Sequence, residues 1–210
     1  MSLPIPPEFT PARDPESAAW FISSLSPWDR PHALVGTFVP FGFRSYARIG
    51  HDPSSPGELP SGQAEVLIEV LGRHTASERG ILLVWDGWGG WGTGISLSPL
   101  GNADDREARM MEEERRSRLA LREFERVPRA VIPGREYVIL EGPLSRMPHF
   151  GLAGWERWPS AWWPHDRAWV VVTEIDSNST YVGGSREVSA EILASRRLGA
   201  VPADLADPIE

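Results

Sequence analysis

Apolar residues recur every three or four positions in two stretches of the chain, which is the spacing of one face of an α-helix. The first stretch runs from Pro15 to about Leu25, and the second covers residues 63–75. A third helix is predicted to begin after Ser185 and to end near Leu198. Ser185 follows two glycines, and its hydroxyl is suited to cap a helix N-terminus. The same N-terminus would also suit an anion, an alternative that the sequence leaves open.

Other stretches have the apolar runs or the alternation that is typical of β-strands. These predicted strands cover residues 32–40, 41–51, 80–85, 136–144, 168–175 and 180–182. The Asp-Ser-Asn-Ser sequence at 176–179 predicts a turn between the last two. Because helices and strands do not alternate regularly, we predict an α+β fold with a mostly antiparallel sheet and three or four flanking helices.

The domain organisation follows from the length of 210 residues, which suits one hydrophobic core. We predict a single domain over 16–198, a Pro-rich extended arm over 1–15 and a poorly ordered tail over 199–210. Residues 102–128 differ in composition from the rest of the chain, since opposite charges recur at helical spacing and apolar residues are sparse. We expect a long charged helix there, which is compatible with an insertion or with an oligomer contact.

Composition narrows the classes of function. The formal net charge is −8 and all basic side chains are Arg, so we expect no nucleic-acid partner, because phosphate binding needs clustered positive charge. The chain has no Cys, which excludes disulfides, thiolate zinc sites and Cys nucleophiles. It has neither a recognisable signal peptide nor an apolar run long enough for a membrane helix. We therefore expect a cytoplasmic protein without a membrane partner.

Two acidic residues at the end of the 168–175 strand are the first chemical candidates. Glu174 and Asp176 would lie on one side if the strand continued, where they could share a cation or divide acid and base roles. A metal would need a third ligand, for which Asp86, His51 and His165 are the candidates. The structural alternative, which we favour, is that Asp176 makes a turn and Glu174 pairs with an Arg.

The sequence His165-Asp166-Arg167 places an imidazole next to a carboxylate, as in sites where an acid orients a general base. Neighbouring side chains on an extended strand point in opposite directions, however, so they seldom bond to each other. We expect Asp166 or Arg167 to order a loop instead.

The most aromatic segment is the Gly-rich and Trp-rich sequence at 85–94. It contains G-x-G-x-x-G after a strand, but the following residues alternate and include Pro99, so the helix that a dinucleotide site requires is not predicted. We expect no cofactor. The Trp-rich loop is a candidate groove for a partner, because Trp is frequent at binding hot spots. The candidate binding residues, in this loop and elsewhere, are Trp85, Asp86, Trp88, Trp91 and Trp163.

Several sequence blocks resemble a group of uncharacterised actinobacterial proteins. The blocks are Phe-Arg-Ser-Tyr-Ala-Arg-Ile-Gly-His at 43–51, Arg-His-Thr-Ala-Ser at 73–77, the Trp-Asp-Gly-Trp-Gly sequence at 85–89, and residues 134–144 and 162–185. The resemblance implies a single intracellular domain and supplies no catalytic residue. A looser resemblance, to SUKH-type immunity proteins, rests on Leu59-Pro60 and on Trp85-Asp86-Gly87.

These observations favour a non-enzymatic protein-binding domain, of the kind that immunity proteins and antitoxins represent, with a basic toxin or other effector as partner. The alternative is an enzyme for a small molecule, assisted or not by a metal. Its candidate catalytic residues are Glu174, Asp176, His165 and His51, and its candidate metal ligands are Glu174, Asp176 and Asp86. The sequence leaves the oligomeric state open.

Overall fold

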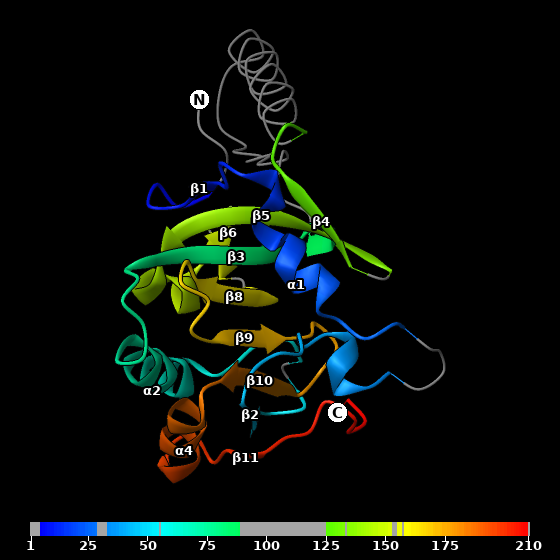
Figure 1. Ribbon diagram of the computed structural model, residues 1–210. Coiled ribbons are helices and arrows are strands. Elements are labelled where there is room, and N and C mark those ends of the chain that lie inside the picture. The colour runs from blue at the N-terminus through cyan, green and yellow to red at the C-terminus, as the bar shows by residue number, and fades with distance from the viewer. Residues whose placement is uncertain are drawn as a thin grey trace, which may run out of the picture.

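An antiparallel sheet of nine strands organises the computed structural model (Figure 1). The structure describes residues 5–28, 33–54, 56–88, 125–132, 134–152, 155–156 and 158–209. In this part the strand order is β1-β5-β3-β8-β9-β10-β2-β11, and β4 also pairs with β5. The strands of this sheet are β1 (Thr10–Pro11), β2 (Ser45–Gly50), β3 (Arg79–Trp85), β4 (Arg129–Ile132), β5 (Arg135–Pro143), β8 (Ala161–Pro164), β9 (Val170–Thr173), β10 (Ser179–Gly184) and β11 (Val201–Pro202).

All of its pairings are antiparallel, and helices lie against the sheet, so the predicted α+β class is confirmed. The α-helices in the described ranges are α1 (Ala19–Ser23), α2 (Ser61–Gly72) and α4 (Arg186–Ala194). Short 3-10 helices in these ranges are η1 (Pro15–Ala18), η2 (Val35–Thr37), η3 (Asp86–Trp88) and η4 (Leu144–His149). Two further strands, β6 (Gly151–Leu152) and β7 (Trp155–Glu156), pair only with each other.

Helices α2 and α4 form where the sequence predicted helices, and they lie side by side against one face of the sheet (Figure 1). The predicted apolar face of α2 is buried, since Leu67 and Leu71 are 0% exposed. Ser185 caps α4 as predicted, because its hydroxyl accepts a hydrogen bond from the Val188 amide at 3.3 Å. The periodic pattern and the cap therefore place these helices correctly, but both helices end earlier than predicted, at Gly72 and at Ala194.

The sheet carries a hydrophobic layer on each face, and adjacent tryptophans of β8 divide between them. Trp162 belongs to the layer that α2 and α4 cover, where its ring meets that of Trp169 edge-on at 5.1 Å. Trp163 points into the layer that α1 and η2 cover, where it stacks on Phe21 at 5.1 Å. Because successive strand residues point to opposite faces, one dipeptide anchors both layers.

Two local expectations are corrected by the structure. Residues 35–37 of the predicted 32–40 strand form η2, in which the Thr37 hydroxyl accepts a hydrogen bond from the Leu34 amide at 3.3 Å. Strands β4 and β8 lie in segments where no strand was predicted. Both are four residues long and have a proline at or near each end, which made a strand difficult to predict there.

Both terminal segments pack onto the sheet. Residue Phe9 is 3% exposed and fills the space beside Gly142, where the ring would come within 2.1 Å of any Cβ. The C-terminal segment, expected to be poorly ordered, forms β11 and then bonds to the start of η2, where the Val35 amide donates to the Asp207 carbonyl at 2.9 Å. Backbone hydrogen bonds thus hold the tail against the domain.

Candidate functional site

The antiparallel strand order decides which candidate residues share an end of the sheet. At one end β3, β9 and β2 finish and β5 begins, which places Trp85, Glu174, His51 and Arg135 at that end. His165 follows β8 at the opposite end, where its amide donates to the Arg79 carbonyl at 3.2 Å. His165, one of the candidate catalytic residues, therefore lies at the other end of the sheet from Glu174.

At the first end, Arg135 binds both candidate carboxylates. One guanidinium nitrogen donates to Glu174 Oε1, and the other donates to Asp176 Oδ2 at 2.5 Å. The guanidinium also lies over the Trp85 ring, 5.7 Å from its centre. We call Arg135 together with Glu174, Asp176 and Trp85 the Arg135 clamp.

The clamp gives the two acids different environments. The side chain of Glu174 is 7% exposed, whereas that of Asp176 is 75% exposed. Glu174 Oε2 also accepts the Asp176 amide at 2.7 Å, so the turn after β9 is tied to the buried carboxylate. A buried carboxylate needs such a partner because an unpaired charge is costly to desolvate. The Glu–Arg ion pair that we favoured from the sequence is confirmed.

Asp86, the third candidate metal ligand, has a separate partner. Its carboxylate lies 3.4 Å from Arg129 Nε, at the start of β4. In the ranges that the structure describes, no three His, Asp or Glu side chains come together in a way that could hold a metal ion. Each acid of the predicted metal set is thus paired with an arginine.

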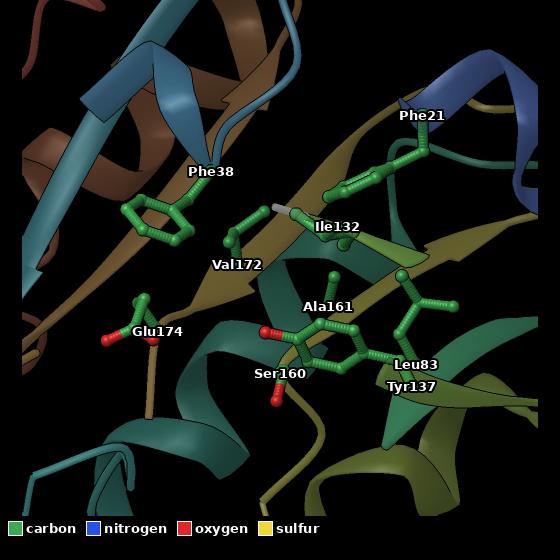
Figure 2. Close-up of a pocket in the computed structure, with 9 residues that line it drawn as sticks. All are labelled: Phe21, Phe38, Leu83, Ile132, Tyr137, Ser160, Ala161, Val172 and Glu174. Carbon is green, nitrogen blue, oxygen red and sulfur yellow. The ribbon is translucent and has the colours of Figure 1, made fainter. Parts of the chain in front are cut away.

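Below the clamp, a pocket opens into the layer that contains α1. Figure 2 shows apolar side chains of different elements around one side of it, and the polar groups of Glu174, Ser160 and Tyr137 around the other. The empty space measures about 270 Å³, including its open mouth. Among the described residues, the lining consists of Phe21, Phe38, Leu83, Ile132, Tyr137, Ser160, Ala161, Val172 and Glu174.

The phenol of Tyr137 stays protonated in this environment. Its desolvation by burial raises the pKa of Tyr137 to about 12, an effect that the Arg135 charge opposes and the Asp176 charge reinforces. The hydroxyl is therefore a hydrogen-bond donor throughout the physiological pH range. Ser160 is 6% exposed, and its hydroxyl has no hydrogen-bond partner among the described residues.

His51 lies beyond the end of β2, two strands from Glu174 in the sheet order. Both ring nitrogens of His51 are buried, and no hydrogen bond of normal geometry reaches them within the described part of the chain. Desolvation lowers the pKa of His51, and the nearby backbone of Ser179 opposes this shift. His51 is consequently a neutral, half-buried side chain at neutral pH.

At the opposite end, Asp166 fastens a loop as the sequence predicted. Its carboxylate accepts the Thr75 hydroxyl at 2.7 Å and the amides of Ala76 and Ala168 at 3.0 and 3.1 Å. Although partial desolvation acts in the other direction, these bonds lower the pKa of Asp166. His165 is 46% exposed, and its Nε2 lies 3.8 Å from Glu141 Oε1.

The candidate binding tryptophans occupy different places. Trp85 is half-buried in the clamp, and Trp163 is 1% exposed in the core, where packing accounts for it. The backbone of Trp88 belongs to η3. Trp91 and most of the predicted 102–128 helix lie outside the described residues.

Comparison with known proteins yields no relative from which a role could be transferred. No protein-family model matches the chain, and neither a curated protein nor a solved structure shows significant similarity to it. The site is therefore interpreted from its own geometry.

Three residues of this end were missed from the sequence, namely Arg135, Tyr137 and Ser160. Arg135 follows Pro133-Gly134, and Gly134 has a φ of 83°, so a turn residue before a strand was its only local signal. The part that each residue plays depends on contacts across several strands, which no local spacing encodes.

Proposed function

We propose that this protein is a cytoplasmic, non-enzymatic binding domain that docks a basic segment of a protein partner at the clamp end of the sheet. The observation that carries the proposal is the Arg135 clamp. It contains one positive and two negative groups, so its net charge is negative, and the more exposed acid, Asp176, is held in a fixed position. Fixed surface charge of one sign steers an oppositely charged partner.

A neighbouring loop extends this negative surface. The loop carries the exposed residues Asp52 and Glu58, and the Gly57 amide between them donates to the Ser177 carbonyl at 2.9 Å. Gly57 has a φ of 76°, and a Cβ there would come within 2.6 Å of the Ile175 carbonyl oxygen, so the loop lies directly against the turn after β9. We call Asp52, Glu58 and Asp176 the acidic rim.

Apolar groups near the clamp supply contact area. Val131 is 64% exposed on β4, and β4 pairs with the strand that begins at Arg135. The half-buried Trp85 ring lies against the guanidinium. A polar rim next to a few apolar anchors is typical of protein interfaces. A basic effector, such as a toxin domain, has the charge to occupy this surface, and its occupation would block the effector.

Co-purification from the native host at increasing salt concentrations tests the proposal. Asp52→Asn with Glu58→Gln removes two charges of the rim, and the Asn keeps an acceptor for the Ser54 amide, which Asp52 now binds at 2.8 Å. The matched control, Glu65→Gln with Glu78→Gln, removes two exposed charges elsewhere. We expect a partner that the rim variant loses at lower salt than the control does, because surface attraction is screened by salt.

The outcomes separate the alternatives. A protein that is recovered alone at every salt concentration contradicts the proposal. Equal retention of a partner by both variants would also contradict it, because the acidic rim would then have no special part.

A further inference from the structure

The pocket below the Arg135 clamp has an apolar floor that three adjacent strands build. Its residues Leu83, Ala161 and Val172 are cross-strand neighbours, since Leu83 pairs with Ala161 and Ala161 pairs with Val172. We call these three residues the pocket floor. Two aromatic rings, of Phe21 in α1 and of Phe38 after η2, also line the space (Figure 2). The surface that solvent reaches inside the pocket is almost wholly apolar.

The Arg135 clamp lies next to the pocket floor on the same face of the sheet. Trp85 follows Leu83 by two positions on β3, and Glu174 follows Val172 by two positions at the end of β9. Side chains two positions apart on a strand point to the same face and are about 6.8 Å apart. An apolar hollow and an acidic surface group therefore lie within the length of a short extended peptide.

The size and the polarity of the pocket decide what can enter it. Sites for drug-sized ligands measure about 300–1,000 Å³, and this pocket is smaller even with its mouth included, at about 270 Å³. The charged group in its described lining, Glu174, already accepts a bond on each oxygen, from Arg135 and from the Asp176 amide. The pocket is thus suited to the end of one small aliphatic side chain.

We propose that the pocket holds an aliphatic side chain of the partner's basic segment, and that an Arg or Lys two positions away on that segment binds Asp176. The inference rests on the proposed function, because the acidic rim supplies the charge complementarity that selects a basic segment. In an extended segment the two side chains lie on one side, about 6.8 Å apart, which is the step from the pocket floor to the clamp. The long basic side chain extends from there to the exposed carboxylate of Asp176.

Two synthetic pentapeptides, acetylated and amidated at their ends, test this pattern by NMR titration of the full isotope-labelled chain. One has the sequence Arg-Gly-Val-Gly-Arg, and the other has Ala in place of Val, so that charge and length are unchanged. We expect the valine peptide to bind at least about fourfold more tightly, which is the contribution of one buried methyl group. The amide signals of Ala161 and Val172 should shift with the valine peptide and much less with the alanine peptide.

Three variants assign the two parts of the pattern. Val172→Ile adds a methyl group to the pocket floor and should abolish the preference for the valine peptide. The matched control, Val171→Ile, adds the same group to the next residue of β9, whose side chain lies in the opposite layer, and should keep the preference. Asp176→Asn removes the exposed charge and should weaken the binding of both peptides by a similar factor.

Equal affinity of the two peptides for the unmodified protein would overturn the inference, and this comparison does not require any variant to fold. If Asp176→Asn still weakened both peptides in that case, charge recognition at the clamp end, and with it the proposed function, would stand. Failure of both peptides to bind would also overturn the inference, whereas the proposed function is decided separately by co-purification. A preference that is unchanged in Val172→Ile would overturn the inference as well, because the pocket would then have no part in it.

Discussion

The two ends of the central sheet both hold a carboxylate in place, but by different physical means. Asp166 is exposed and is fixed by neutral donors, one hydroxyl and two amides. Glu174 is buried and is fixed by the charge of Arg135. Asp166, although it follows a histidine in the sequence, only orders a loop. Glu174, at the end of a predicted strand, is one partner of a buried ion pair. The energetic consequences of losing a partner should differ accordingly.

The largest effect is expected from Arg135→Met, which leaves Glu174 buried without its counter-charge. Removal of one partner from a buried pair costs about 3–5 kcal/mol. Urea unfolding at neutral pH measures the loss. The control is Arg79→Met. Arg79 pairs with Glu141 at 3.2 Å, and its side chain is 44% exposed. We therefore expect this variant to lose at most about 1 kcal/mol of stability. Equal losses for both variants would remove the distinction between buried and exposed pairs.

Asp166→Ala should have the next largest effect, because it leaves the Thr75 hydroxyl and two amides without their acceptor. With a net value of about 1 kcal/mol per hydrogen bond, and water available to the exposed groups, we expect a loss of about 2 kcal/mol. Asp176→Ala, which removes an exposed partner of Arg135, should cost less than about 1 kcal/mol. Thermal or urea unfolding ranks the two variants. The reverse order would mean that Asp176 contributes more to stability than Asp166 does.

The pH dependence of stability should distinguish the clamp end through His51. Its pKa is lowered in the folded state, so the folded protein binds fewer protons than the unfolded chain. Its contribution to stability is therefore complete above the unfolded pKa of about 6.5 and is lost as the pH falls through the folded pKa. Unfolding free energies from pH 8 to pH 5 should fall more steeply for the unmodified protein than for His51→Gln. If the unfolding free energy had the same slope against pH in both proteins, the folded state would not oppose protonation of His51, which would contradict this prediction.

The smallest effect is expected at Arg167, which follows Asp166. Its φ of 54° lies in the left-handed region, and its guanidinium lies over the Trp20 ring at 5.2 Å from the ring centre. Arg167→Ala keeps the backbone strain and loses the ring contact, so it should cost about 0.5–1 kcal/mol. Arg167→Gly also relieves the strain and should be close to the unmodified protein. A glycine variant that is less stable than the alanine variant would contradict this account.

Much of the fold could be predicted from the sequence, because the relevant signals are local. The apolar face of α2, the Ser185 cap and the apolar run of β3 each lie within a dozen residues. The proline-flanked strands β4 and β8 carry weaker signals, and the turn of η2 depends on a side-chain hydrogen bond that alternation does not reveal.

The site was less accessible to prediction. Glu174 and Asp176 were found, together with the expectation that an arginine would bind Glu174, but the sequence did not identify that arginine. Arg135 precedes Glu174 by 39 positions, and the two residues meet only because β5, β3, β8 and β9 are neighbours in that order. Local periodicity contains no information about strand order.

A double-mutant cycle between Arg135 and Glu174 tests most directly the claim that the buried acid is a structural partner. The cycle uses Arg135→Met, Glu174→Gln and the double variant, each measured by urea unfolding at neutral pH. We predict that the double variant is more stable than the sum of the single losses implies, with a coupling of about 2–3 kcal/mol. A coupling within error of zero would contradict the account, because Glu174 would then be held by something other than Arg135.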